Sequence, residues 1–374
     1  MSIDLERLSS PARVANPEEG ISSDELQLAA RNHGMPLESL HWDITPPGLH
    51  YLLIHYDIPA IDPGTFELIV DGLVDKSLSL DLDDLRSRPQ ISAVVTLECA
   101  GNGRLQLLPR PVSQPWLTEA VGTARWTGTP LSSLLQEAGV AEGAVDVIFT
   151  GADHGIERGH EQDYQRALPL AEAMRDGVML AYEMNGAPLP PQHGAPLRLI
   201  VPGWYGMAHV KWLRRITVVA EPFDGFQMRA YRFRDSPDDP GIPLTRIEPR
   251  ALLIPPGFPD FMSRRRVARS GEVLIEGRAW SGWAEVTAVE ISVDGGDTWE
   301  FADLDRRLDS YGWARWSWTW RAEPGSYLLS ARATDATGRT QPLGQRWSRG
   351  GFANNTIQTV PVEVISSEMS LLAL

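Results

Sequence analysis

The chain has 374 residues, of which 43% are hydrophobic and 22% are charged, and its formal net charge is −15. A chain of this length and apolar content can bury two ordinary cores, so we expect two domains. The negative charge repels phosphate backbones and anionic lipids, which argues against nucleic acid and membrane as partners.

Residues 1–7 contain no basic segment followed by an apolar one, and no twin-arginine signal precedes a hydrophobic stretch. No run of about 18 apolar residues occurs, so we expect no transmembrane helix and a cytoplasmic location. The single cysteine cannot attach a c-type haem or hold an iron–sulfur cluster. If electrons leave this protein, a separate acceptor has to take them.

The first part of the chain predicts an extension followed by an α+β domain. Residues 1–40 are polar and loosely patterned, and we expect them to wrap the surface. From 41 to 240 the pattern mixes strands, such as 66–72 and 146–151, with helices and shows no regular βαβ rhythm. Residues 130–139 predict a helix that ends at a glycine.

Proline-rich connections at 236–243 and 255–259 mark the expected domain boundary, because helices cannot continue through them. From 250 to 365 short alternating segments predict a β-sandwich. The Asp-Gly-Gly-Asp sequence at 294–297 is a strong hairpin signal.

Trp316, Trp318 and Trp320 alternate along one expected strand and therefore share one face. We expect most tryptophans of this region to pack in the sandwich core. Part of this face is expected to pack against another subunit.

Cys99 is the most informative single residue. It follows the β-branched run 91–97, which predicts a buried strand, and it opens a small-residue turn that ends at Arg104. Arg104 and the N–H groups of the turn could stabilise a thiolate. One cysteine cannot form a disulfide within the chain or a cysteine-only zinc site, which leaves a nucleophile, a single ligand to a soft metal, or a small buried hydrophobe.

The sequence Thr-Leu-Glu-Cys-Ala-Gly-Asn-Gly-Arg at 96–104 resembles the molybdenum-ligating segment of the sulfite oxidase family of molybdopterin enzymes. Motifs spread over 180–213 resemble the cofactor-binding region of that family, in the same order. The segment 292–299 resembles its C-terminal dimerisation domain. The resemblance thus extends over most of the chain.

The resemblance implies an α+β molybdopterin-binding domain over 41–240 and an immunoglobulin-like β-sandwich over 250–365 that pairs two chains. It implies a molybdenum–molybdopterin cofactor, with the Cys99 thiolate as a metal ligand. The implied reaction is oxygen-atom transfer between the metal and a small sulfur oxyanion, sulfite to sulfate. Electrons would pass to a separate acceptor such as a cytochrome.

The resemblance also assigns the site residues one by one. His193, Arg198 and Lys211 are implied to contact the cofactor, with the two cations suited to its phosphate. The remaining implied cofactor contacts are His55 and Asp153, and His209 and Val210 through their backbones. The implied catalytic pocket, beside Cys99, consists of Arg104, Trp116, Tyr231 and Arg349.

One departure from the family concerns the substrate. Leu53 stands where typical members carry the arginine of an Arg-Asn-His sequence, and the Arg31-Asn32-His33 sequence occurs too early to be that motif. Loss of a cation from a site for a dianion weakens binding by roughly 2 to 5 kcal/mol if nothing compensates. Sulfite is therefore in doubt as the substrate.

Three alternatives to a sulfite oxidase follow. A reductase of S-oxides or N-oxides on the same fold would suit Leu53, because its substrate is less anionic. Cys99 could instead act as a nucleophile in a metal-free hydrolase or transferase, with His55 or His193 as the base. An adhesion or assembly protein built on the sandwich is the third, but it leaves the charged cofactor positions unexplained.

Overall fold

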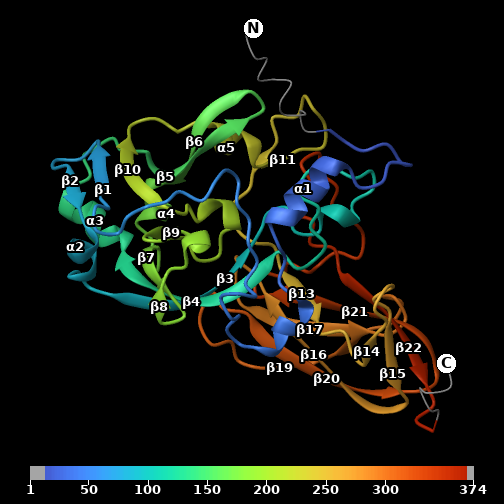
Figure 1. Cartoon of the computed structure of the whole chain (residues 1–374). Coiled ribbons are helices and arrows are strands. Elements are labelled where there is room, and N and C mark those ends of the chain that lie inside the picture. The colour runs from blue at the N-terminus through green and yellow to red at the C-terminus, as the bar shows by residue number, and fades with distance from the viewer. Residues whose placement is uncertain (1–12, 369–374) are drawn as a thin grey trace.

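The computed structural model describes residues 13–368 and shows two units packed against each other (Figure 1). Residues 1–12 of the expected N-terminal extension lie outside the described residues. In residues 13–40 most side chains are exposed or half-buried, while Met35 and Leu40 are fully buried. Helix α1 (Ser23–Arg31) begins with a capping box between Ser22 and Glu25.

The first unit contains two sheets with one large core. One sheet has the strand order β2-β1-β10-β5-β6, and β1 and β10 pair in parallel. The other has the order β3-β4-β7-β8, with β9 paired to β7. The strand bounds are β1 (Leu68–Gly72), β2 (Leu78–Leu80), β3 (Ile91–Glu98), β4 (Val121–Pro130), β5 (Asp146–Glu157), β6 (His160–Pro169), β7 (Met179–Met184), β8 (Ala187–Pro188), β9 (Arg198–Ile200) and β10 (Leu213–Val219).

Short helices connect these strands. The expected helix is α3 (Leu131–Ala138), and it ends at Gly139, whose φ of 69° is the left-handed conformation that glycine adopts readily. The other helices are α2 (Leu82–Arg86), α4 (Leu170–Ala173), α5 (Phe226–Ala230) and the 3₁₀ turns η2 (Leu37–His41), η3 (Arg104–Gln106), η4 (Pro191–His193) and η5 (Gly206–Ala208). The mixture of strands and helices confirms the predicted α+β class.

The second unit is the predicted β-sandwich. A four-stranded sheet, β13-β16-β20-β19, packs on a six-stranded sheet, β14-β15-β22-β21-β17-β18. The 294–297 turn lies between β17 and β18, which pair in antiparallel fashion as expected. The bounds, together with the small hairpin that precedes the sandwich, are β11 (Arg232–Phe233), β12 (Ile242–Pro243), β13 (Arg250–Leu253), β14 (Phe258–Pro259), β15 (Arg266–Arg269), β16 (Gly271–Trp280), β17 (Val286–Ser292), β18 (Glu300–Phe301), β19 (Asp303–Leu304), β20 (Ala314–Ala322), β21 (Gly325–Asp335) and β22 (Gln358–Ile365).

The tryptophan face of β20 packs inward. Trp316 and Trp320 are buried in the core between the two sheets, and Trp318 packs against that core. The expected burial of this face against another subunit is therefore corrected for Trp316 and Trp320, because the chain's own second sheet covers them.

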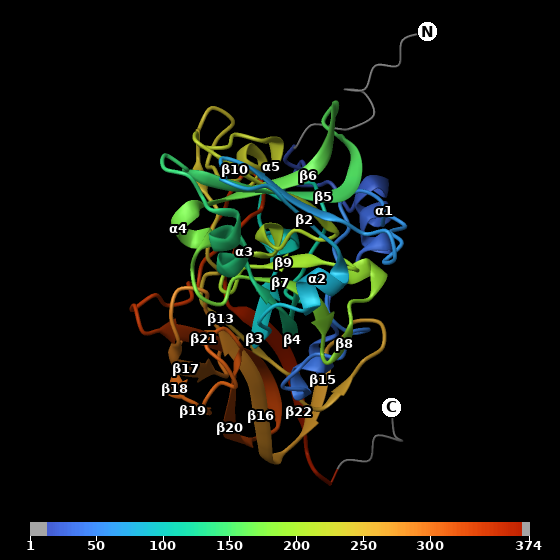
Figure 2. The ribbon, with the colours of Figure 1, turned by 90° about the vertical axis from the view of Figure 1, so that its left-hand side faces the viewer.

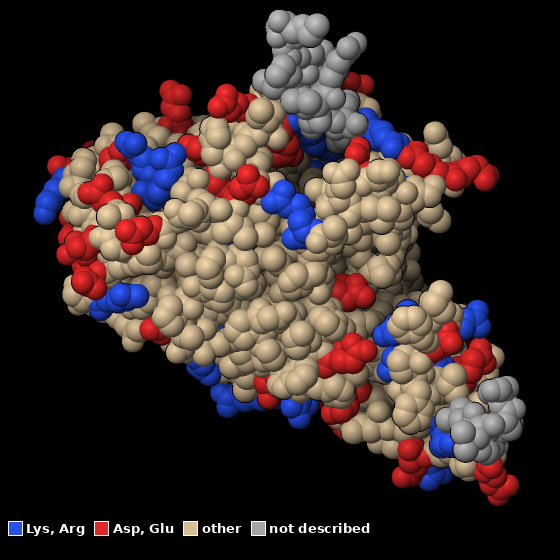
Figure 3. Space-filling model, in the orientation of Figure 1, with Lys and Arg blue, Asp and Glu red and all other residues tan. Residues whose placement is uncertain are grey.

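Strand β3 lies next to the sandwich, and the sheet that contains β5 lies farther from it (Figure 2). The Thr96 N–H donates to the Tyr311 carbonyl at 2.9 Å, which ties β3 to a loop of the second unit. On the face seen in Figure 3 charged side chains lie mostly near the edges, and the middle is largely uncharged. No helix among residues 13–368 is long and apolar enough to cross a membrane.

Candidate active site

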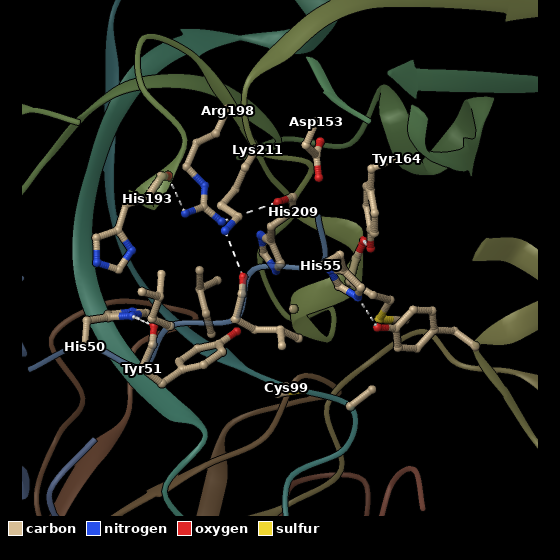
Figure 4. Close-up of a pocket in the computed structure, with 17 residues that line it drawn as sticks. His50, Tyr51, His55, Cys99, Asp153, Tyr164, His193, Arg198, His209 and Lys211 are labelled. Carbon is tan, nitrogen blue, oxygen red and sulfur yellow. Dashed lines mark hydrogen bonds between the residues drawn. The ribbon is translucent and has the colours of Figure 1, made fainter. Parts of the chain in front are cut away.

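Two cavities share Cys99. The first cavity is lined by two cationic side chains, four histidines and one aspartate, which come from β5, β9 and neighbouring loops and turns. The second cavity extends from Cys99 toward α1 and the 349–352 loop. Leu53, His55 and Tyr231 also line both cavities. Figure 4 shows the first cavity with Arg198 and Lys211 at one end and Cys99 at the other.

Cys99 follows the last residue of β3, as the sequence predicts, and it is 6% exposed. The Gly101 N–H donates to its Sγ at 3.4 Å. Burial raises the pKa of the Cys99 thiol, while Arg104, the Gly101 N–H and the Trp116 indole oppose this. A thiolate at this position therefore needs a stronger cationic partner than Arg104. A bound metal ion is such a partner.

Glu98 anchors the Cys99 turn to the second unit, which the sequence did not indicate. Its carboxylate is 1% exposed and accepts hydrogen bonds from Asn102 Nδ2 at 3.0 Å, Arg250 Nε at 2.8 Å and Trp280 Nε1 at 2.7 Å. Arg250 and Trp280 belong to β13 and β16. The carboxylate thus connects the end of β3 to both the turn and the sandwich.

Lys211 and Arg198 place two cations in the first cavity. Lys211 Nζ donates to the Leu53 carbonyl at 2.8 Å, and Arg198 Nη1 donates to the His193 carbonyl at 2.9 Å. Burial, reinforced by Arg198, lowers the pKa of Lys211 to about 7, and burial lowers the pKa of Arg198 to about 10. Both charged forms are therefore destabilised, and an anion bound here would stabilise them.

Asp153 lines the same cavity and opposes these cations only in part. It is 4% exposed, and burial raises the pKa of its carboxyl to about 6, although Lys211 acts to lower it. The hydrogen-bond acceptors of Lys211 and Arg198 are the backbone carbonyls of Leu53, Gln192, His193 and His209, not Asp153. The cavity accordingly keeps an excess of positive charge near neutral pH.

The histidines of the first cavity are neutral near pH 7. Burial lowers the pKa of His50 to about 4, of His55 to about 3 and of His193 to about 2. His209 has a pKa of about 3 for the same reason. Neutral rings can donate one hydrogen bond and accept another without adding charge.

His209 and Val210 differ from the other predicted cofactor contacts because both are hydrogen-bonded to the backbone of neighbouring segments. His209 accepts at Nδ1 from the Val201 N–H at 3.1 Å, and its Nε2 lies 3.0 Å from the Trp204 carbonyl. Val210 packs in the core of the first unit and does not line either cavity. Its N–H donates to Ala208, and its carbonyl accepts from Leu199. The structure thus gives Val210 a backbone role within the wall.

Tyr231 and His55 form a pair at the junction of the cavities. Tyr231 Oη and His55 Nε2 are hydrogen-bonded at 2.8 Å, although 176 residues separate them in the sequence. Burial raises the pKa of Tyr231, so its hydroxyl stays protonated. Because His55 is neutral, the pair holds the tyrosine hydroxyl at a fixed point beside Cys99.

The second cavity contains the four other residues predicted for the catalytic pocket. Arg104, Trp116, Tyr231 and Arg349 line it together with Cys99. Arg104 is held by the Gln114 carbonyl at 2.9 Å and the Gly350 carbonyl at 3.0 Å. The structure therefore brings Arg104 and Arg349 to one cavity from two different units.

Comparison with known proteins relates this geometry to a family. A model of the oxidoreductase molybdopterin binding domain matches residues 55–227, and a model of the Mo-co oxidoreductase dimerisation domain matches residues 259–365. The sulfite oxidase of Gallus gallus is 36% identical over 331 residues, which cover 80% of this chain and 68% of that protein. The chain belongs to the sulfite oxidase family.

Other relatives broaden the comparison. Mitochondrial sulfite oxidase of Mus musculus is 35% identical over 86% of this chain, and the match spans only 62% of that relative's length. A nitrate reductase [NADH] of Oryza sativa subsp. japonica is 31% identical over 87% of this chain and 38% of that protein. The crystal structure of the sulfane dehydrogenase SoxCD from Paracoccus pantotrophus matches with a TM-score of 0.77 and 26% identity, covering 97% of this chain and 90% of that chain.

Family membership implies the molybdenum cofactor, and the residues of this sulfite oxidase family member fit it. The cofactor is an anionic pterin with soft sulfur ligands, and the first cavity offers two cations and one thiol. Arg198 Nε is buried without a hydrogen-bond partner among the described residues, as expected for a donor aimed at a bound anion. At Gly206 a Cβ would lie 2.5 Å from Tyr51 Oη, so a larger residue would clash with the tyrosine that lines the same cavity.

The sequence did not single out three further residues of the first cavity of this sulfite oxidase family protein. His50, Tyr51 and Tyr164 line it, and Tyr164 Oη donates to the Met207 carbonyl at 2.8 Å. His50 and Tyr51 lie five and four residues before His55 in an apolar stretch that shows no catalytic pattern. Only their proximity to His55 could have drawn attention to them.

Proposed function

We propose that the chain catalyses molybdenum-dependent oxidation of a small sulfur oxyanion, sulfite to sulfate, and passes two electrons to a separate acceptor such as a cytochrome. The observation that carries this proposal is the position of Cys99 between a cavity lined by the cations Arg198 and Lys211 and a second cavity lined by four arginines, Arg31, Arg104, Arg158 and Arg349. The match spans only 62% of the length of the sulfite oxidase of Mus musculus, so the activity of that relative is transferred to this chain only as a proposal.

When bound, the cofactor supplies the metal-centred two-electron oxygen transfer. In this proposal Arg198 and Lys211 bind its phosphate, and the Cys99 thiolate ligates the metal. The other proposed cofactor contacts are His55, Asp153, His193, His209 and Val210. Cys99, Asp153, His193, Arg198 and His209 are buried, and the low water content around them strengthens each electrostatic contact.

The second cavity would hold the substrate. Arg104 is oriented by two backbone carbonyls, which leaves its remaining N–H groups for an anion. Tyr231, fixed by His55, offers a neutral hydroxyl beside Cys99, and Trp116 and Arg349 complete the proposed catalytic pocket. Such preorganised donors stabilise charge that develops in a transition state without reorganisation.

We further propose that residues 41–240 form the catalytic domain and residues 250–365 the dimerisation domain of a homodimer. The match of 259–365 to the dimerisation model supports this assignment. The cytoplasmic location expected from the sequence stays a prediction.

The second candidate function is reduction of an S-oxide or N-oxide, and the observation that favours it is the apolar side chain of Leu53 in both cavities. A metal-free Cys/His enzyme has less support. His55 is bonded to Tyr231, His193 Nε2 lies 3.3 Å from the Pro47 carbonyl, and no histidine among the described residues is hydrogen-bonded to Cys99 Sγ.

The test is a pair of assays on the purified holoenzyme. We expect sulfite to reduce an added cytochrome or dye, and we expect Cys99→Ser to abolish this turnover. Oxidation of a reduced viologen by S-oxides, without sulfite turnover, would replace the proposal with the reductase. Turnover that persists in protein without molybdenum would refute both.

A further inference from the structure

The end of α1 is fastened to the segment that enters the active site. The His33 N–H donates to the Leu52 carbonyl at 3.2 Å, and the Leu52 N–H donates back to His33 at 2.8 Å. The buried Asn32 accepts at Oδ1 from the Ile54 N–H at 2.7 Å. The Arg31-Asn32-His33 sequence, though misplaced along the chain for the family motif, therefore lies beside residues 52–56 in space.

These contacts place Arg31 at the second cavity. Its guanidinium donates through Nη2 to the Tyr56 carbonyl at 2.6 Å, and Arg31 lines the same cavity as Cys99 and Arg104. One bond to a carbonyl leaves the other N–H groups of the fork for an anion. The backbone pairing on either side of Leu52 fixes where α1 ends, so the location of Arg31 does not depend on its side chain alone.

The charge of Arg31 is only weakly offset. Its carboxylate neighbour is Asp57, at 3.6 Å, and the Asp57 side chain is 98% exposed, whereas that of Arg31 is 44% exposed. An exposed pair at this distance contributes little. Arg31 therefore presents a positive charge at the edge of the cavity in a protein whose net charge is −15.

The acidic groups of this cavity are largely occupied elsewhere. Glu25 is ion-paired with Arg110, which is buried with it. Burial raises the pKa of Glu157, which also accepts a hydrogen bond from Gln227 at 3.1 Å. Asp24 is the other acidic residue of the lining and is exposed. The cavity thus keeps a cationic edge that an approaching anion would meet first.

We propose that Arg31 is a specificity-determining residue, which binds the anionic group of a sulfur oxyanion at the edge of the second cavity. Leu53 lines the same cavity with an apolar side chain, so the cation comes from α1 and not from the segment that α1 is fastened to. This inference rests on the proposed function, because it concerns the substrate of that same site.

The test compares Arg31→Gln and Arg31→Lys with wild-type holoenzyme. We expect Arg31→Gln to raise the KM for sulfite by about 3- to 10-fold with kcat unchanged. The KM of this variant should also depend less on salt concentration than that of wild type, because a charge at the rim acts mainly on the rate of substrate association. Arg31→Lys should recover part of the loss. Arg321→Gln, which changes an exposed arginine on β20, is the matched control and should leave KM unchanged.

Calorimetric titration with sulfate separates this inference from the proposed function. We expect sulfate to bind wild type and Arg321→Gln equally and to bind Arg31→Gln about 3- to 10-fold more weakly. That result supports the inference even if sulfite is not oxidised, a failure that would overturn the proposed function alone. Equal sulfate affinity in Arg31→Gln and wild type, or no sulfate binding by wild type, would overturn the inference.

Discussion

At the scale of single residues, the first cavity concentrates groups whose charged forms the fold destabilises. Loss of water contact lowers the pKa values of Lys211 and Arg198 and raises the pKa of Cys99. Each of these groups gains a partner if an anionic cofactor with a bound metal enters. The bound cofactor would relieve this destabilisation, and the free energy gained would favour tight binding of the cofactor.

Lys211 gives a prediction about pH. Its pKa is about 7 in the folded chain and ordinarily 10.5, so above pH 7 the unfolded chain binds more protons, and stability rises with pH. In cofactor-free protein, Lys211→Met should remove this rise between pH 7 and 8.5, below the range in which Cys99 titrates. Urea unfolding at several pH values measures it. Lys76→Met, at an exposed lysine, should keep the wild-type slope, and an unchanged slope in Lys211→Met would refute the prediction.

Tyr231 gives a prediction about catalysis. Tyr231→Phe removes the hydroxyl bonded to His55, which costs about 1 kcal/mol of stability. If the hydroxyl stabilises developing charge, kcat should fall by about tenfold or more. Steady-state kinetics and thermal unfolding of the same preparation measure both effects. A variant that loses stability but keeps the wild-type kcat would show that the pair is only structural.

At the scale of elements, the turn after β3 is held from two sides. The Glu98 carboxylate accepts hydrogen bonds from Arg250 and Trp280 of the sandwich. In addition, Asn354 Nδ2 donates to the Gly103 carbonyl at 2.9 Å. A turn that carries a metal ligand has to be rigid, because small displacements cost much of the catalytic effect. The second unit therefore acts directly on the position of Cys99.

Arg250→Met tests this anchoring. It leaves the Glu98 carboxylate buried without its charged partner, and such losses destabilise by about 3 to 5 kcal/mol. Urea unfolding should show a loss of this size. Arg321→Met removes an arginine from an exposed position on the same unit and should change stability by less than about 0.5 kcal/mol. Equal stability of the two variants would contradict the anchoring.

At the scale of the whole molecule, local sequence patterns predicted the secondary-structure elements but not the tertiary contacts between distant residues. The run before Cys99, the glycine after α3 and the turn at 294–297 have short-range physical causes, and each lies where expected. The bond between His55 and Tyr231 joins positions 176 residues apart. No spacing rule covers such a contact, because it depends on how the segments that carry the two residues pack in the fold.

The same reasoning explains what the resemblance left out. It assigned individual residues to the cofactor or the substrate, but the role of Glu98 depends on β13 and β16, and that of Arg31 on the pairing of His33 with Leu52. Val210 was assigned through its backbone, and its side chain packs in the core of the first unit. A matched motif therefore does not place the side chain of every one of its residues in the cavity.

The central claim is that the cavities meeting at Cys99 hold a molybdenum cofactor through Arg198 and Lys211. Elemental analysis by inductively coupled plasma mass spectrometry, on protein from a host that makes the cofactor, tests it directly. The account predicts near-stoichiometric molybdenum in wild type and in Lys76→Met, and strong depletion in the folded double variant Arg198→Met, Lys211→Met. Wild-type protein without molybdenum, or a double variant that retains the full amount, would contradict it.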